Sequence, residues 1–87
     1  MASFRVEWVK SAKKDLRKLP SHAVARILEV TAALGQDPFP RGSKKLTGSE
    51  NSYRVRIGDY RVIYDILDCL VIIEIQAVGH RKDIYRK

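Results

Sequence analysis

Arginines alternate with apolar residues in the last third of the chain, in the stretch Tyr53-Arg54-Val55-Arg56-Ile57. Successive side chains of a strand point to opposite faces of a sheet, so Arg54 and Arg56 share one face while Tyr53, Val55 and Ile57 face a core. A guanidinium stays charged at neutral pH, and its planar fork matches the geometry of a phosphate. The spacing therefore predicts a cationic surface on a rigid sheet, which suits a polyanion.

Four more residues extend this candidate site: Arg61 in the next predicted strand, and His80, Arg81 and Tyr85 at the end of the chain. Arg61 and Arg81 are suited to stabilising charge that develops on phosphoryl oxygens. Tyr85 can stack on a base, and its hydroxyl can take part in proton transfer. His80 has the only nearby side chain whose unperturbed pKa is close to neutral, which makes it a candidate acid or base.

The same residues have plainer interpretations. Arginines on a strand are often a solvated sheet face, His80 can be structural, and Tyr85 can serve to dock the end of the chain. Asp65 and Glu74 are either a general base or, more simply, charges that neutralise the arginines across the sheet. His22, at the start of a predicted helix, is expected to be exposed and without a role.

Further basic residues are predicted to contact RNA. Four lie on a predicted helix, where the simplest interpretation is a solvated face and the second is contact with a nucleic acid. Two lie in the segment before the sheet. They are Lys13, Lys14, Arg17, Lys18, Lys44 and Lys45.

Composition narrows the class of protein. Seventeen Lys and Arg against ten Asp and Glu give +7 over 87 residues, which attracts nucleic acid, an acidic membrane or an acidic protein. The length predicts a single domain, residues 1–87. No run approaches the roughly 18 apolar residues of a membrane span, and the start has no signal-peptide pattern. Cys69 is the only cysteine, which indicates a reducing cytoplasm. No residue spacing fits a metal site, and we expect no cofactor.

Hydrophobic periodicity predicts an α+β fold in which two N-terminal helices pack on a mainly antiparallel four-stranded sheet, in the order β-α-α-β-β-β. Ser11 and Ser21 are suited to cap the helices, and Gln36 to Gly42 reads as an irregular connector. The predicted strands are Phe4–Val9, Asn51–Ile57, Tyr60–Leu67 and Leu70–Val78, and the predicted helices are Ser11–Leu19 and His22–Leu34.

This order of elements, together with several motifs, resembles the RelE/ParE family of bacterial toxins and specifically its RelE branch. The resemblance covers nearly the whole chain. Its most specific parts are Tyr53-Arg54-Val55-Arg56, Gly58-Asp59-Tyr60-Arg61-Val62-Ile63-Tyr64 and Val78-Gly79-His80-Arg81-Lys82-Asp83-Ile84-Tyr85.

The resemblance implies a ribosome-dependent endoribonuclease that cleaves messenger RNA in the ribosomal A site and is held inactive by a cognate acidic, RelB-like antitoxin. Carried over by position, the catalytic cations of the family correspond to Arg54, Arg56, Arg61 and Arg81, and the terminal tyrosine to Tyr85. The best-known RelE pattern has lysines where this chain has Arg54 and Arg56. Because arginine stays protonated, neither residue is expected to be a general base.

The predicted chemistry needs no metal. The substrate's own 2′-OH would attack the adjacent phosphorus while the protein removes one proton, stabilises the phosphoryl charge and protonates the leaving 5′-oxygen. Two other functions remain open at this stage. One is a ParE-like poison of DNA gyrase, which would not need Arg81 and Tyr85; the other is a basic domain that binds RNA without cleaving it.

Overall fold

The computed structural model describes residues 3–82. Over that range the elements are β1 (Arg5–Trp8), α1 (Lys10–Arg17), α2 (Ser21–Ala33), β2 (Ser43–Lys45), β3 (Ser52–Ile57), β4 (Tyr60–Leu67), the short 3-10 helix η1 (Asp68–Leu70) and β5 (Ile72–His80).

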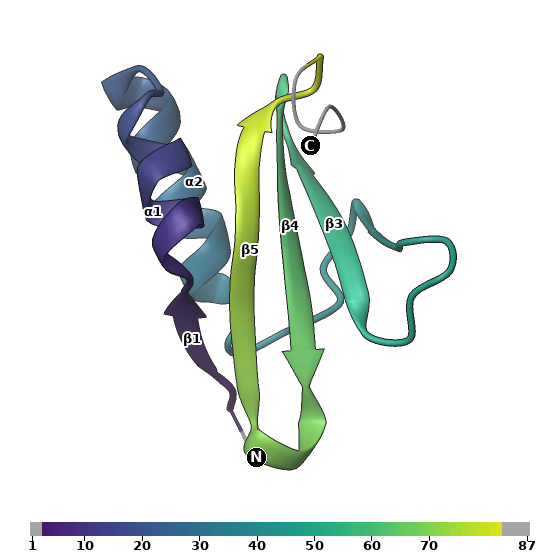
Figure 1. Cartoon of the computed structure of the whole chain (residues 1–87). Helices are drawn as coiled ribbons and strands as arrows, with labels where there is room; N and C mark the ends of the chain where they lie inside the picture. The colour runs from purple at the N-terminus through teal and green to yellow at the C-terminus, as the bar shows by residue number, and fades with distance from the viewer. Residues whose placement is uncertain (1–2, 83–87) are drawn as a thin grey trace.

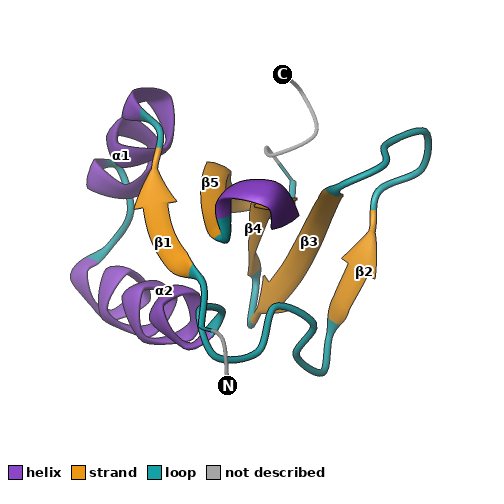
Figure 2. Ribbon diagram, turned by 90° about the horizontal axis from the view of Figure 1, so that it is seen from below, coloured by secondary structure: helices purple, strands orange, loops and turns teal. Residues whose placement is uncertain are grey.

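Within these described residues the strands form one five-stranded sheet in the order β1-β5-β4-β3-β2. Strand β1 runs parallel to β5, and the other neighbouring pairs are antiparallel. Both helices lie on one side of the sheet, α1 against β5 and α2 against β3, and among the described residues neither helix covers the other side (Figures 1 and 2). The predicted α+β class, with two N-terminal helices on a mainly antiparallel sheet, is confirmed. We call the uncovered side the open face.

Strand β2 is a strand that the sequence did not predict, so the sheet has five described strands instead of four. Its three residues pair with β3, with Lys44 opposite Arg54 and Lys45 opposite Tyr53. A strand this short shows no alternation of polar and apolar residues. Its lysines also disfavour pairing with another chain at the edge that β2 forms.

The helices start differently from the prediction. Helix α1 begins at Lys10 with Val9 as N-cap, and α2 begins at Ser21 with Pro20 as N-cap. Neither N-cap side chain makes a hydrogen bond; the backbone carbonyls of Val9 and Pro20 accept the first N–H groups instead. The predicted capping roles of Ser11 and Ser21 are therefore wrong, because both serines lie inside the helices, and Val9 and Pro20 have the extended backbone that a cap requires.

The core lies between the helices and the inward face of the sheet. Tyr64 is fully buried there, and its hydroxyl donates a hydrogen bond of 2.7 Å to the carbonyl oxygen of Pro38. Tyr53 stacks on Tyr64 with 6.0 Å between ring centroids. The connector between α2 and β2 passes across the side of the sheet away from the open face, as Figure 1 shows, and Tyr64 attaches it there.

A β-bulge interrupts the pairing of β4 with β5. Ile63 lies opposite Ala77 and the next residue of β4 lies opposite Ile75, so Gln76 is an extra residue. The alternation of faces along β5 shifts by one at this point. Unbroken alternation along the predicted strand Leu70–Val78 would place Ala77 toward the core and Val78 outward. That expectation is wrong, because Val78 is only 3% exposed whereas Ala77 is half-buried.

We expect Tyr64→Phe to lower the free energy of unfolding at neutral pH by about 1–2 kcal/mol, because the Pro38 carbonyl loses its donor. Burial, the largest cause, raises the pKa of Tyr64 to about 12, while a hydrogen bond from Ser43 lowers it. Below pH 10 the folded and unfolded chains both keep this proton. Above it the unfolded chain loses the proton first, so the contribution to stability is lost as pH rises from about 10 to 12.

Urea unfolding between pH 7 and 12 measures this effect, with Tyr60→Phe as a control for a tyrosine that is not fully buried. The gap in stability between wild type and Tyr64→Phe should close as pH rises through this range. A gap that stays constant to pH 12 would contradict the buried, hydrogen-bonded state of this hydroxyl.

Candidate nucleic-acid interface

The strand register places the three predicted sheet arginines on the open face. Arg56 and Arg61 are direct partners across β3 and β4, and Arg54 is two residues from Arg56 on the same strand. The intervening residues Val55 and Ile57 are 2% and 6% exposed and face the helices. Directly opposed residues of neighbouring strands share a face, so all three guanidinium groups belong to the uncovered side of the sheet, as predicted.

Arg56 and Arg61 put two like charges in directly opposite positions. Such a cross-strand pair lowers the stability of a sheet, by roughly 0.2–1 kcal/mol. Arg56 is exposed and Arg61 is half-buried, so solvent screens this repulsion only in part. A polyanion bound between the two guanidinium groups would remove the repulsion.

The bulge brings Arg81, and not His80, toward the same face. Gly79 lies opposite Arg61, and the backbone N–H of Arg81 donates a 2.8 Å hydrogen bond to the carbonyl oxygen of Asp59, which extends the β4–β5 pairing by one residue. Alternation from Gly79 through His80 then gives Arg81 the side of Arg61. The side chain of Arg81 is exposed there.

His80 lies on the opposite side, with the helices. It is the direct partner of Tyr60, and the two rings make an edge-to-face contact with 5.7 Å between centroids. Its Nδ1 accepts a 3.2 Å hydrogen bond from the backbone N–H of Lys82. The structure therefore separates His80 from the arginines, and its sequence-based assignment as their acid or base gains no support from this geometry. Tyr85 lies outside the described residues.

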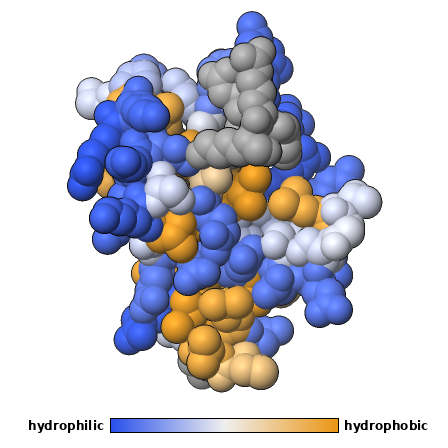
Figure 3. Space-filling view, in the orientation of Figure 1, coloured by the Kyte–Doolittle hydropathy of each residue, from blue (hydrophilic) through white to orange (hydrophobic). Residues whose placement is uncertain are grey.

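Acidic residues form a row across the same open face, next to the arginines. Asp65 lies opposite Glu74, and Glu74 lies opposite Glu7 on β1. Asp65 accepts a 2.6 Å hydrogen bond from Ser52, Glu74 accepts one of 2.6 Å from Gln76, and Glu7 pairs with Arg5 at 2.9 Å. The open face thus has a basic end near the β3–β4 turn and an acidic row beyond it. Over the described residues that are visible in Figure 3, this face is largely hydrophilic, and hydrophobic residues gather at the lower end, where β4 leads into β5.

The other predicted RNA contacts fall into two places. Lys44 lies opposite Arg54 and continues the basic end of the open face onto β2. Lys44, Lys45 and Arg54 line a hollow of about 270 Å³ together with Leu46 and Thr47. The helix cations are exposed on α1, on the other side of the sheet, so the structure does not bring them together with the sheet arginines. They are Lys13, Lys14, Arg17 and Lys18.

Within residues 3–82, no group of three or more His, Cys, Asp and Glu side chains is arranged to hold a metal ion. No helix in that part of the chain is long and apolar enough to cross a membrane.

Comparison with known proteins assigns the family. The profile of the family described as ParE toxin of type II toxin-antitoxin system, parDE, matches residues 6–85. The chain belongs to the RelE/ParE toxin superfamily.

Named relatives place this toxin on the RelE side of the superfamily. It is similar to toxin RelG of Mycobacterium tuberculosis, with 32% identity over 85 residues that cover 97% of this chain and 98% of that protein. Among solved structures it resembles a chain of the toxin-antitoxin complex RelBE2 of M. tuberculosis, with a TM-score of 0.82 and 32% identity over 95% of this chain and 97% of that one. It also resembles a chain of the archaeal RelE-RelB complex of Pyrococcus horikoshii OT3, with a TM-score of 0.81 and 35% identity over 93% and 98%.

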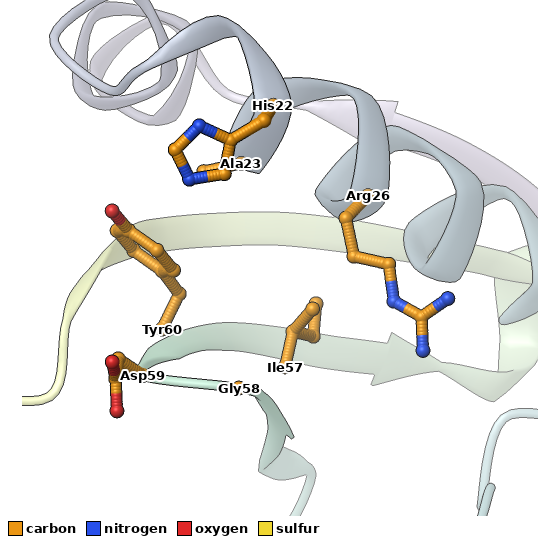
Figure 4. A pocket seen from close by; sticks show the side chains of 7 residues that line it. All are labelled: His22, Ala23, Arg26, Ile57, Gly58, Asp59 and Tyr60. Atoms are coloured by element: carbon orange, nitrogen blue, oxygen red, sulfur yellow. The ribbon is translucent and has the colours of Figure 1, made fainter.

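One feature of the toxin was missed by sequence reasoning. His22 is exposed, as expected, and it lines a hollow of about 350 Å³ between the start of α2 and the β3–β4 turn. Figure 4 shows the His22 ring above the hydroxyl end of Tyr60, while Asp59 points the other way. The guanidinium of Arg26, which also lines the hollow, pairs with Glu29 at 3.2 Å. The hollow lies on the helix side of the sheet. His22 and Ile57, on its opposite walls, are 35 residues apart in sequence, so no local sequence pattern predicts it.

We expect Arg56→Ala to raise the free energy of unfolding of the toxin at low salt by up to about 0.5 kcal/mol, because it removes the repulsion between Arg56 and Arg61. Added salt screens that repulsion, so the gain should shrink at 1 M NaCl. Thermal unfolding in 20 mM and 1 M NaCl measures it. Arg5→Ala is the control, since Arg5 pairs with Glu7 and its loss should bring no gain. A clear destabilisation by Arg56→Ala at low salt would contradict the opposed-charge geometry.

Proposed function

We propose that this toxin is a ribosome-dependent endoribonuclease that cleaves messenger RNA in the A site, inhibits translation in the cytoplasm, and is controlled by a RelB-like antitoxin. The observation that carries the proposal is the position of Arg54, Arg56 and Arg61 on one uncovered sheet face, at the end where the bulge also directs Arg81. The arrangement supports transition-state charge stabilisation on a phosphate, since several guanidinium groups converge where phosphoryl charge would develop.

The proposed reaction is an internal transfer at phosphorus. The 2′-oxygen of the message forms a bond to the adjacent phosphorus and loses its proton to a base, the bond from phosphorus to the 5′-oxygen breaks, and that oxygen takes up a proton. The products are a 2′,3′-cyclic phosphate and a 5′-hydroxyl. Arginine cannot accept the first proton. The carboxylates of Asp65, Glu74 and Glu7 are the groups of the described open face that can.

Arg81→Ala should lower the rate of cleavage at saturation by about 100-fold or more, while the affinity for programmed ribosomes changes only a few-fold. The reason is that Arg81 is proposed to act on charge that exists only in the transition state. Lys82→Ala is the matched control, because it removes the same charge from the next exposed position. Single-turnover kinetics on programmed ribosomes separate the rate from the affinity.

Full activity in Arg81→Ala, or equal losses in both variants, would contradict the role of Arg81. Activity lost in a chelator that leaves the ribosome intact would contradict the metal-free reaction. Plasmid supercoiling measured in the same cells tests the gyrase alternative, which the match with the ParE family profile supports.

Lys13→Ala, on α1, should weaken binding to the ribosome more than it slows cleavage. Tyr85→Phe keeps the stacking ring and removes the hydroxyl, so it separates stacking from proton transfer.

The proposed partner is an acidic antitoxin. The similar chains of M. tuberculosis and P. horikoshii were solved in toxin-antitoxin complexes, and the +7 charge of this chain favours an acidic partner. Coexpression with the acidic product of a neighbouring gene should relieve toxicity. It should also raise the melting temperature, since a partner present at 1,000 times its Kd adds about 4 kcal/mol. An unchanged melting temperature with unrelieved toxicity would count against this partner.

A further inference from the structure

Phe39 is an exposed aromatic side chain that the protein holds in a fixed position. Phe39 is 58% exposed and lies between two prolines in the connector before β2. Its backbone N–H donates a 3.0 Å hydrogen bond to Oδ1 of Asp37, and the carbonyl of Pro38 accepts the 2.7 Å hydrogen bond from buried Tyr64. Single exposed apolar residues are common and need no explanation. This one differs because its own backbone N–H and the carbonyl of the preceding Pro38 both make hydrogen bonds.

The ring of Phe39 also has a defined orientation. It meets Tyr53 edge to face, with 5.3 Å between centroids and 74° between planes. Tyr53 in turn stacks on buried Tyr64 at 6.0 Å, so the three rings form a continuous support that ends at the surface. In an edge-to-face pair, Tyr53 covers at most one face of the Phe39 ring. A flat apolar surface is therefore presented to solvent. Because the ring is already held in place, a ligand that binds it loses little free energy to ordering the side chain.

Three cationic side chains lie near these aromatic rings, at the edge of the sheet formed by β2 and β3. Lys45 is the direct partner of Tyr53 and shares its side of the sheet. The neighbouring hollow of about 270 Å³ is lined by Lys44, Lys45 and Arg54. Arg54 and Lys44 belong to the open face, whereas Lys45 and the aromatic rings lie on the other side. A cationic path thus leads from the open face around β2, the outermost strand in Figure 2, to the Phe39 ring.

We propose that Phe39, supported by Tyr53, is a stacking platform for an unpaired RNA base, with the hollow at Lys44 and Lys45 holding a phosphate of the same strand. The inference rests on the proposed function, because it extends the path of an RNA that lies on the open face. Alternating aromatic and cationic groups suit single-stranded RNA, since every base has a flat π face and each nucleotide brings one phosphate. If Phe39 were instead an anchor for a protein partner, that partner would have to provide a pocket that encloses the ring.

The test measures the affinity of the toxin for programmed ribosomes, together with the rate of cleavage at saturation, in a series at position 39. Phe39→Ala should weaken binding about tenfold, within the range measured for base stacking on aromatic side chains, and leave the saturated rate unchanged. Phe39→Trp should bind as wild type does. Phe39→Leu keeps an apolar side chain without a π face and should bind as weakly as Phe39→Ala. Leu28→Ala, which changes an exposed apolar residue on α2, is the control and should have no effect.

Each alternative has its own result. Wild-type binding by Phe39→Ala or by Phe39→Leu would overturn the platform. The platform would also be overturned if Phe39→Ala lowered the affinity for the antitoxin and left the affinity for ribosomes unchanged. The exposed ring would then be a contact for a protein partner. Melting temperatures of the variants exclude unfolding as the cause of a loss.

A second measurement separates this inference from the proposed function. Fluorescence anisotropy compares binding of a 12-nucleotide single-stranded RNA with that of the same strand carrying abasic sites. Phe39→Ala should weaken binding of the first and not of the second. This result would support the platform even if no cleavage occurs on ribosomes. Conversely, cleavage that persists with no effect of Phe39 in either measurement would overturn the platform and leave the proposed function standing.

Discussion

One extra residue in β5 decides which side chains of that strand lie on the open face of the sheet. Because Gln76 is not matched on β4, the residues after it change sides: Val78 turns into the core, His80 packs on Tyr60, and the position of Arg81 falls on the open face. Without the bulge, His80 would lie beside Arg61, and Arg81 would lie with the helices. The composition of the basic end therefore depends on a local feature of backbone pairing.

The open face also shows how stability and binding oppose each other. Arg56 and Arg61 are held opposite each other, although like charges in that position weaken the sheet. The acidic row at Asp65, Glu74 and Glu7 makes its own contacts within the protein, with Ser52, Gln76 and Arg5. These contacts give the face a permanent polarity, attractive to phosphate at one end and repulsive at the other. If the open face binds RNA, as we propose, this polarity would restrict the position of the polyanion, which a uniformly basic face would not do.

Much of this arrangement follows from the sequence. Alternation in β3 and β4 predicts the two faces correctly, and the predicted strand Tyr60–Leu67 has the bounds of β4. Both helices were found from their apolar spacing, although their caps were not, because Val9 and Pro20 cap them through backbone geometry alone. The roles of the individual site residues stay predictions, since neither the fold nor the family assigns them.

Other features had no signal in the sequence. The bulge at Gln76 follows from how two strands pair, which the alternation within one strand does not record. The fixed position of Phe39 depends on Tyr64, 25 residues away, whose hydroxyl binds the carbonyl of Pro38. The hollow at His22 joins elements that are still further apart in sequence. A short strand such as β2 carries too few residues to show a period. Local patterns thus predicted the elements, whereas the contacts that refine the site are long-range.

In the mechanism we propose, the message lies on the open face of β3, β4 and β5. An electron cryomicroscopy structure of the toxin on a programmed ribosome, with a 2′-deoxy nucleotide at the cleavage position to prevent reaction, would locate the message. We expect the scissile phosphate to lie against Arg54, Arg56 and Arg61, with the helices facing away from the message. A message bound on the helix side, or a toxin whose open face contacts no RNA, would contradict it.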